Sequence, residues 1–357
     1  MADSTETASD RTAADRKGDH LRIAAYDERT QRPGPTSGLE HLTFEALSLP
    51  ELDLEQVSTA CTLLGKPLRA PLLVGAMTGG NAQAGQINRI LAEAAERCGV
   101  GFCLGSQRPM LDLATESIAT FAMRDVAPTA LLFGNIGAIQ LRDHLSGADL
   151  DQLARAVGAD AMMIHLNPLQ EAIQPEGDRD WRGIHDALAE VAASSSTPIV
   201  IKEVGMGLSA QTLQRLRSLG IAGVETAGVG GTSWARIESL RHAERTPRAI
   251  AGEVLAGFGT STAESIRLAR AALQNRLVIG SGGLRTGLDV ARCIALGADA
   301  CAMAWPFLKA AHQGVDAVVT EIEGVIETLR VVMFLTGAPD LHQLARTPVV
   351  EAELRSR

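Results

Sequence analysis

Aromatic residues are scarce in this sequence: Phe, Trp and Tyr make up 3% of 357 residues, whereas hydrophobic residues as a whole make up 46%. A chain of this length can bury a large core, which must then consist mainly of Ala, Val, Leu and Ile. No run reaches about 18 consecutive apolar residues, the length needed to cross a bilayer. The opening stretch "MADSTETASDRTAADRKGDH" also lacks the apolar segment of a signal peptide. We therefore expect a cytoplasmic protein with no membrane partner.

The sequence also lacks an excess of positive charge, because its formal net charge is −9. This balance disfavours nonspecific binding to nucleic acid, although a local basic pocket for an anion stays compatible with it. The five cysteines form no CxxC or Cys/His spacing, which argues for a reduced protein without structural zinc. The Walker, HExxH and GxGxxG patterns are absent as well. Function must therefore be sought in the fold.

Beyond residue 60, short apolar runs alternate with Ala/Leu-rich helical patterns, which is typical of parallel βα units. Several helical patterns end in Gly, the usual residue after a helix, as in "QINRILAEAAERCG", "SAQTLQRLRSLG" and "TGLDVARCIALG". Eight such units predict a (β/α)8 TIM barrel, and a doubly wound open sheet is the alternative. The eight predicted strands lie within 70–78, 101–106, 130–137, 161–167, 198–205, 223–228, 277–283 and 300–306.

Other segments lie outside this repeat. Residues 1–15 are expected to be a disordered N-terminal extension, and residues 16–60 an arm that covers the barrel. Residues 61–357 would form the barrel and end with an amphipathic helix within 314–338. The long insertion at 229–261, after the sixth strand, has the length of a lid or binding loop.

Barrel enzymes place their chemistry at the C-terminal ends of the strands. After strand 7, "GSGGLRTG" would let backbone N–H groups approach a phosphate, although a tight turn requiring glycine is the alternative. Lys202 ends an apolar strand and would face an electron-rich cofactor atom, or else pair with Glu203 or Glu225. With "AMTGG", Asn135 and Thr232, these ends outline a pocket for a phosphorylated flavin.

The stretch "HLNPLQEAIQPEGDRDW" (165–181) follows the fourth predicted strand. Glu171 has no second acid at chelating spacing, a pattern that suits Mg²⁺ because this ion keeps several waters and shares phosphate oxygens with a ligand. His165, Asn167 and Gln170 would supply neutral hydrogen bonds around that ligand. The alternative is that His165 pairs with backbone and "PEGD" is only a turn.

Basic residues occur at two further places. Arg108, in "GSQR", would bind an anionic substrate group bidentately unless it forms a surface ion pair. Arg16 and Lys17, in "DRKGDH", would be solvated unless the arm folds over the barrel and closes on a diphosphate.

Together, "RKxxH", "AMTGG", "GSQR", "HLNPLQEAIQPEGDRDW", "KEVGMGLS", "GVGGTSW", "GSGGLRTG" and "LTGA" resemble the type 2 isopentenyl diphosphate isomerase family. The resemblance runs from about Arg16 to about Ala338. It implies a barrel enzyme that interconverts isopentenyl and dimethylallyl diphosphate with FMN, Mg²⁺ and NADPH as reductant. It also implies a homotetramer or homo-octamer with a small-molecule diphosphate substrate.

The resemblance assigns the following site residues by position. Those around FMN would be Ala76, Met77, Thr78, Ser106, Asn135, Lys202, Thr232, Gly282, Gly283, Arg285, Ala304 and Trp305. Substrate contacts would be Arg16, Lys17, Gln107, Arg108, His165, Asn167 and Gln170, and Glu171 would hold the metal. Gln170 and His165 are the expected catalytic residues, with Gln170 positioning or relaying a proton.

Two other readings compete with this one. FMN-dependent 2-hydroxy acid oxidases carry a His-Gly-Arg cluster after strand 6, whereas this sequence has "AGVGGTSW" there. A non-catalytic barrel that binds a phosphorylated ligand is the second alternative, and retention of Gln170, Glu171 and the basic clusters argues against it.

Overall fold

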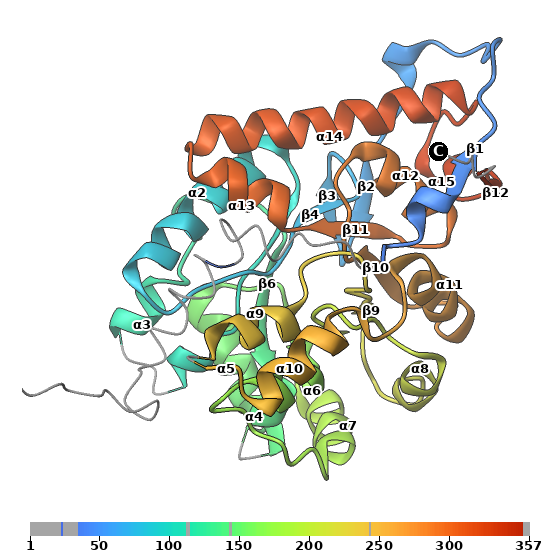
Figure 1. Ribbon diagram of the computed structural model, residues 1–357. Coiled ribbons are helices and arrows are strands. Elements are labelled where there is room, and N and C mark those ends of the chain that lie inside the picture. Colours follow the sequence, from blue (N-terminus) through green and yellow to red (C-terminus); the bar gives the residue numbers. More distant parts are fainter. Residues whose placement is uncertain (1–22, 24–34, 112–114, 143–144, 243, 353–357) are drawn as a thin grey trace, which may run out of the picture.

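The computed structural model describes residue 23 and residues 35–111, 115–142, 145–242 and 244–352, and its centre is a closed barrel (Figure 1). Eight parallel strands pair in the order β10-β11-β4-β5-β6-β7-β8-β9. Because β11 pairs with β4, the last strand closes on the first, which confirms the predicted TIM barrel and excludes the open sheet. The strands are β4 (Leu72–Val74), β5 (Gly101–Cys103), β6 (Leu132–Gly137), β7 (Ala161–His165), β8 (Ile199–Lys202), β9 (Gly223–Glu225), β10 (Leu277–Ser281) and β11 (Ala300–Met303).

Helices surround the strands as predicted, and local signals set their ends. Helix α2 (Ala82–Cys98) begins four residues before the predicted pattern because the Asn81 side chain accepts a hydrogen bond from the Ala84 N–H. It ends at Gly99, whose φ of 64° suits glycine. The other helices after strands are α5 (Gly147–Val157), α7 (Ile184–Ser194), α8 (Ala210–Leu216), α11 (Thr262–Ala272), α12 (Gly287–Ala295) and α13 (Trp305–Ala311). Shorter ones are η5 (Arg108–Met110), α3 (Thr115–Ala119), α4 (Ala138–Arg142) and α6 (Pro168–Ile173).

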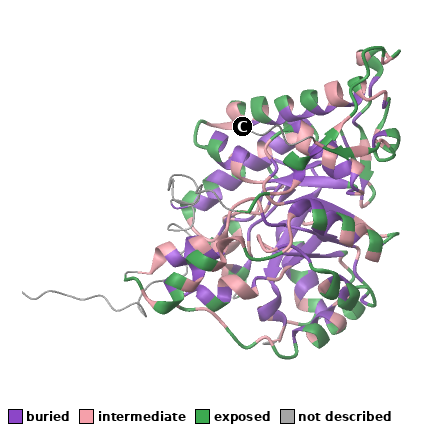
Figure 2. Ribbon diagram, turned by 45° about the vertical axis from the view of Figure 1, so that its right-hand side comes forward, coloured by how far each residue is buried: buried purple, intermediate pink, exposed green. Residues whose placement is uncertain are grey.

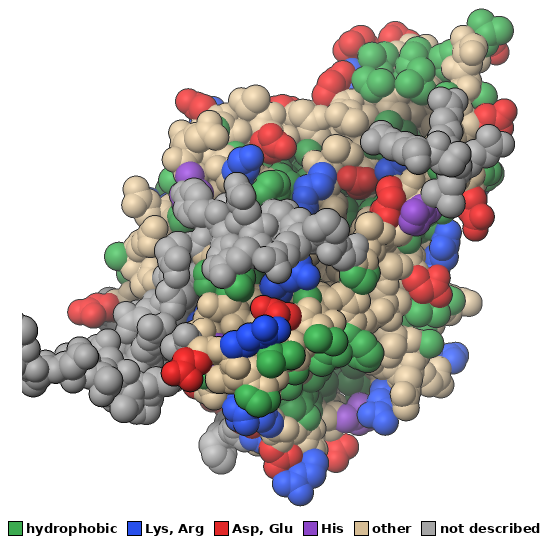
Figure 3. All heavy atoms as spheres, viewed as in Figure 1, with side chains coloured by type: hydrophobic (Ala, Val, Ile, Leu, Met, Phe, Trp, Pro, Cys, Tyr) green, Lys and Arg blue, Asp and Glu red, His purple; other side chains and the backbone are tan. Residues whose placement is uncertain are grey.

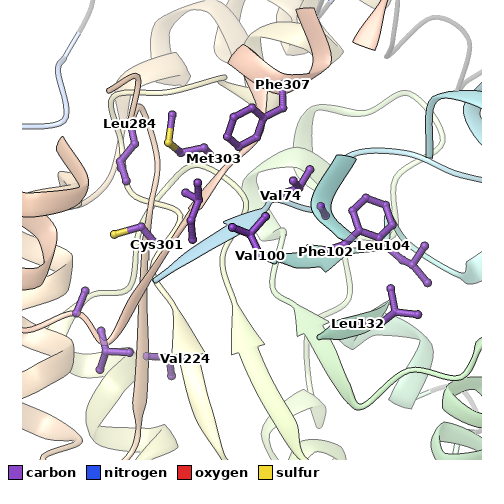
Figure 4. Packing of buried hydrophobic residues seen from close by; sticks show 14 of the residues in the cluster. Val74, Val100, Phe102, Leu104, Leu132, Val224, Leu284, Cys301, Met303 and Phe307 are labelled. Atoms are coloured by element: carbon purple, nitrogen blue, oxygen red, sulfur yellow. The ribbon is translucent and has the colours of Figure 1, made fainter. Parts of the chain in front are cut away.

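The core has two parts, and the strands between them are buried (Figure 2). Between strands and helices, Val74, Phe102 and Phe307 pack in one large apolar cluster, seen in part in Figure 4. Inside the barrel, Leu73 and Phe133 pack with Leu63 and Leu68 of the hairpin β2 (Cys61–Leu63) and β3 (Lys66–Leu68). This hairpin precedes β4 and packs among residues near the strand starts, so it closes the end of the barrel opposite the C-terminal strand ends.

Segments from both ends of the chain lie side by side outside the barrel (Figure 1). Strand β1 (Leu42–Phe44) pairs antiparallel with β12 (Val349–Glu351). The predicted C-terminal helix is α14 (Val315–Leu335), which packs on α2, α12 and α13. The remaining elements here are η3 (Leu39–His41), η4 (Leu54–Gln56) and α15 (Leu341–Leu344). The predicted extension, residues 1–15, falls outside the described residues, and so does the first part of the predicted arm up to residue 34, apart from residue 23.

The predicted insertion forms α9 (Trp234–Arg241), α10 (Pro247–Val254) and η6 (Leu255–Gly257) between β9 and α11. Helices α9 and α10 pack on each other and on α6, the helix that carries Gln170 and Glu171. Hydrophobic side chains gather over α10 on the face shown in Figure 3, where Ile250 is 40% and Val254 76% exposed. Within the described part of the chain, none of the helices is long and apolar enough to cross a membrane.

Candidate active site

A deep pocket lies at the C-terminal ends of the barrel strands, the rim where the sequence predicts the chemistry. Most of the predicted site residues line it. They are Ala76, Met77, Thr78, Ser106, Arg108, Asn135, His165, Asn167, Gln170, Glu171, Lys202, Thr232, Gly282, Gly283, Arg285, Ala304 and Trp305.

Gln107 does not line this pocket but lies behind its wall. Its side chain is fully buried, and its Oε1 accepts a hydrogen bond of 2.8 Å from the Asn135 N–H. Its Nε2 lies 3.3 Å from the Leu153 carbonyl oxygen and donates to it. The structure therefore places the Gln107 side chain against β6 and α5, outside the lining of this pocket. Arg16 and Lys17 lie outside the described residues.

The glycine-rich turn after β10 forms an anion-sized cradle at one side of the pocket. Gly282 and Gly283 have φ values of 110° and 83°, and a Cβ on Gly283 would meet the Gly230 carbonyl oxygen at 2.3 Å. A side chain here would be strained and would also displace backbone, so glycine is required. Helix α12 begins just beyond, where Thr286 and Asp289 form a capping box. Backbone N–H groups can approach a phosphate at such a turn.

Cationic and aromatic side chains stack beside this cradle. The Arg285 guanidinium lies 5.0 Å from the centroid of the Trp305 ring, and the Lys309 ammonium lies 5.4 Å from the same centroid. Burial lowers the pKa of the Arg285 guanidinium, and the nearby Asp289 carboxylate opposes that shift. A positive charge held in a partly dry environment attracts an anion strongly.

Several polar atoms of the pocket wall are buried without a hydrogen-bond partner among the described residues. They include Thr78 Oγ1, Glu225 Oε2 and Trp305 Nε1. Buried polar atoms are normally satisfied, so their gathering in one pocket indicates a ligand with both donors and acceptors.

Lys202 and Glu225 end neighbouring strands and form a buried pair. Lys202 Nζ lies 3.7 Å from Glu225 Oε1 and donates to the Glu203 carbonyl oxygen at 2.6 Å. Ser281 Oγ also donates to Glu225 Oε1, at 2.8 Å. The pairing proposed as an alternative for Lys202 therefore exists, yet its side chain still lines the pocket. Glu225 was expected only as that partner, although an acid within the apolar run "GVETAG" was a signal for a site residue; it ends β9 and lines the pocket.

Glu203 holds the backbone of the loop that follows β8. Its Oε2 accepts hydrogen bonds of 2.7 Å from the N–H groups of both Val204 and Gly205. Burial raises the pKa of the Glu203 carboxyl to about 7, although these N–H donors and Lys202 oppose the shift. Val204 and Gly205 line the pocket, so this carboxyl shapes the wall from behind.

The ends of β6 and β7 hold a hydrogen-bonded pair. His165 Nδ1 lies 2.8 Å from Asn135 Oδ1, and Asn135 is 3% exposed. This contact orients the imidazole, which lines the pocket.

Glu171, on α6, is a buried carboxylate with neutral neighbours. It is 6% exposed, its Oε1 accepts from Asn167 Nδ2 at 3.0 Å, and its Oε2 accepts from the Asp178 N–H at 2.9 Å. Asn167 Oδ1 is buried without a partner in the described part of the chain. In the same part of the chain, no group of three or more His, Cys, Asp or Glu could hold a metal ion. A cation bound here would have a single protein carboxylate among its ligands, a coordination that is common for Mg²⁺.

A charged network that was not predicted lies behind Gln170. Gln170 Nε2 donates to Glu238 Oε1 at 2.8 Å, and Arg241 Nη1 lies 2.5 Å from Glu238 Oε2. Arg241 Nη2 lies 3.0 Å from Glu176 Oε1, in the "PEGD" turn. Charges three residues apart in "WARIESLRH" were the available signal, but such pairs are common on solvated helices. Gln174 was missed as well: it lines the pocket with its Nε2 buried and unpaired among the described residues.

Comparisons with known proteins agree with this geometry. The family model for FMN-dependent dehydrogenases matches residues 139–351. The isopentenyl-diphosphate delta-isomerase of Stutzerimonas stutzeri (strain A1501) is 43% identical over 346 residues, covering 96% of this chain and 99% of that protein. The protein of the same name from Methanosarcina barkeri (strain Fusaro / DSM 804) is 39% identical and covers 95% of this chain and 92% of its own.

Among solved structures, mandelate oxidase with benzoyl-formic acid has a TM-score of 0.62 at 18% identity, covering 94% of this chain and 93% of that one. At this identity the likeness shows a shared fold. The curated relatives are similar over nearly the whole chain, and they show that the chain belongs to the isopentenyl-diphosphate delta-isomerase family.

Proposed function

We propose that this enzyme interconverts isopentenyl and dimethylallyl diphosphate, using FMN reduced by NADPH and a Mg²⁺ ion. The names of its relatives support the reaction, and the matched family model supports the flavin. The observation that carries the proposal is the gathering of a glycine cradle, the buried Lys202 ammonium, the partly buried Arg285 guanidinium and the buried Glu171 carboxylate in one pocket.

The pocket fits FMN in charge and in hydrogen-bonding capacity. The Gly282–Gly283 turn would hold the phosphate, with Arg285 close to the same turn. Thr78, Lys202 and Glu225 would meet the polar edge of the ring, where Thr78 Oγ1 and Glu225 Oε2 lack partners among the described residues. FMN in its reduced form would supply an atom that can give and take a proton.

The surroundings of Glu171 fit a divalent cation. A buried carboxylate that accepts hydrogen bonds from neutral donors, here Asn167 Nδ2 and the Asp178 N–H, is costly, and a cation would remove most of that cost. Glu171 would hold Mg²⁺, and the remaining ligands would be water and diphosphate oxygens.

The side chains of the chain bind and orient the substrate in this proposal. Arg108 would bind the diphosphate, and so would Arg16 and Lys17 if the arm closes over the pocket. That binding energy would fix the short alkene in a dry space, since water would capture a cation-like intermediate. Gln170 and His165 line the same space, and Gln170 would position or relay the proton removed from the substrate.

An FMN-dependent 2-hydroxy acid oxidase is the second candidate, because mandelate oxidase shares the fold. The end of the sixth strand argues against it: "AGVGGTSW" offers no basic side chain to bind a carboxylate or abstract a proton. A non-catalytic barrel for a phosphorylated ligand would not need the network around Gln170.

We also propose that the protein is a cytoplasmic homotetramer or homo-octamer. Exposed apolar side chains such as Leu49, Val254 and Phe258, which are 84%, 76% and 62% exposed, could be covered in such an assembly. Light scattering coupled to gel filtration tests the assembly, and a monomer would contradict it.

The experiment that tests the reaction is anaerobic incubation of isopentenyl diphosphate with the protein, FMN, NADPH and Mg²⁺. The expected product is dimethylallyl diphosphate, formed only when the flavin is reduced. A protein that carries reduced FMN and forms no isomer would overturn the proposal, and oxidation of mandelate or lactate by the oxidised protein would favour the oxidase.

A further inference from the structure

The ion pair between Arg241 and Glu238 lies directly behind Gln170 and is almost fully buried. The Glu238 side chain is 0% exposed and the Arg241 side chain 3% exposed, whereas Glu176, the other acid that Arg241 contacts, is 42% exposed. Both buried residues belong to α9, in the insertion, and Gln170 belongs to α6. A contact across 68 residues of sequence therefore joins the insertion to a pocket residue.

This ion pair determines which way the Gln170 amide points. An ionised carboxylate only accepts hydrogen bonds, so the Gln170 amide nitrogen must face Glu238. The amide oxygen is then turned to the other side, where it accepts from Asn167 Nδ2 at 3.2 Å. Asn167 Nδ2 also donates to Glu171, so the two amides are oriented in series between two carboxylates.

Arg241 supplies a positive charge that keeps the Glu238 carboxylate ionised. A carboxyl group buried without a cation takes up a proton, and a protonated carboxyl can donate as well as accept. Gln170 could then turn over and exchange the positions of its amide nitrogen and oxygen. Arg241 Nη1 at 2.5 Å from Glu238 Oε2 supplies the opposing charge.

We infer that Arg241 is a positioning residue, which acts through Glu238 to hold the Gln170 amide oxygen toward the substrate. The inference rests on the proposed isomerase function, because it makes the Gln170 amide oxygen the group that faces the proton leaving the substrate. It also gives the insertion after β9 a role in the reaction, since α9 brings Arg241 and Glu238 to α6.

The test compares Arg241→Met, which removes the charge, with Arg241→Lys, which keeps it. Arg241→Met should lower kcat by about 10- to 100-fold, the loss typical of a misplaced reacting group, while KM changes by less than about threefold. Arg241→Lys should restore most of kcat. The matched control is Arg267→Met on α11, whose side chain is 48% exposed and lies 3.9 Å from Glu264; it should leave kcat unchanged.

A double-mutant cycle distinguishes positioning from support of the fold. In a Gln170→Ala background, Arg241→Met should add less than about a twofold loss in single-turnover rate, because there is no amide left to orient. Full additivity, or a folded Arg241→Met with wild-type kcat, would overturn the inference. If Arg241→Met does not fold, Glu238→Gln tests the same inference. It keeps the shape of the Glu238 side chain but removes its charge, so it should lower kcat while KM stays similar. A wild-type protein without isomerase activity would instead refute the proposed function.

Discussion

Replacing Glu171 by glutamine should weaken the proposed binding of Mg²⁺ without destabilising the metal-free fold. The buried carboxylate accepts hydrogen bonds from Asn167 Nδ2 and the Asp178 N–H, and no cation partner is recorded for it in the described structure. In Glu171→Gln one of these contacts is lost, at a cost of about 1 kcal/mol. Removing the buried charge also removes its desolvation cost of several kcal/mol, which more than offsets the lost hydrogen bond. The metal-free variant should therefore unfold at the same temperature as wild type or higher.

The expected effect on metal binding has the opposite sign. Replacing a group that only supports a metal ligand typically weakens metal binding about 10- to 100-fold, so loss of the ligand charge itself should raise the Mg²⁺ concentration for half-maximal activity by about that much or more. Unfolding entropy of about 2.1 cal/mol/K per residue makes 1 kcal/mol equal to ~1.3 °C for a chain of 357 residues. Mg²⁺ at about 100 times its wild-type Kd should stabilise wild type by ~2.7 kcal/mol, or ~3.6 °C. A variant that binds about 100-fold more weakly should gain only ~0.4 kcal/mol, or ~0.5 °C.

Thermal unfolding with and without Mg²⁺ and inorganic pyrophosphate, together with Mg²⁺ titration of the isomerase rate, measures both effects. The matched control is Glu264→Gln on α11, where the side chain is 51% exposed. The reasoning would be refuted by a Glu171→Gln protein that needs no more Mg²⁺ than wild type, or by one that is destabilised only in metal-free buffer.

Three further predictions follow from buried polar groups. Gln107→Leu should cost about 1–3 kcal/mol in urea unfolding and lower kcat/KM, because the Asn135 N–H loses its acceptor; unchanged values would contradict the placement of Gln107 behind the wall. Lys202→Met should weaken FMN binding in equilibrium dialysis by about tenfold or more and destabilise the fold by ~3–5 kcal/mol, since Glu225 stays buried without its cation; full FMN affinity would argue against the predicted contact. The pKa of the Glu203 carboxyl is about 7 in the folded state, above its usual 4.5. Between these two pH values the folded state keeps the carboxyl proton that the unfolded state has lost. The stability this contributes is complete below about pH 4.5 and is lost as the pH rises through 7, by about 3 kcal/mol at most. The melting temperature of wild type should therefore fall between pH 5 and 8 relative to Glu203→Gln, and parallel curves would refute the shift.

The barrel could be predicted because its signals are local. Each predicted apolar run contains one barrel strand, and Gly99 and Gly297 follow the helices where the sequence placed the helix ends. Closure was the step that periodicity left open, and only the pairing of β11 with β4 decided it. Such pairing depends on the twist of the whole sheet, which no single run encodes.

Much of the site was predictable for a related reason. Parallel strands in a barrel bring all their C-terminal ends to one rim, so His165, Lys202 and the glycines after β10 meet although they are far apart in sequence. The rule says which segments meet but not which side chains turn inward. Arg108 lines the pocket while its neighbour Gln107 is turned behind the wall, where its Oε1 accepts a hydrogen bond from the Asn135 N–H of β6.

The order of apolar and polar residues along this chain was thus enough to specify eight strands and the rim they share, whereas most of the groups expected to line that rim came from the resemblance to a known family. Only tertiary structure decided that α9 docks on α6, which makes Glu238 and Arg241 a buried pair behind Gln170 rather than a solvated pair on a surface helix. The physical reason is that the effect of a charge depends on how much water surrounds it, and here water is excluded by residues distant in sequence.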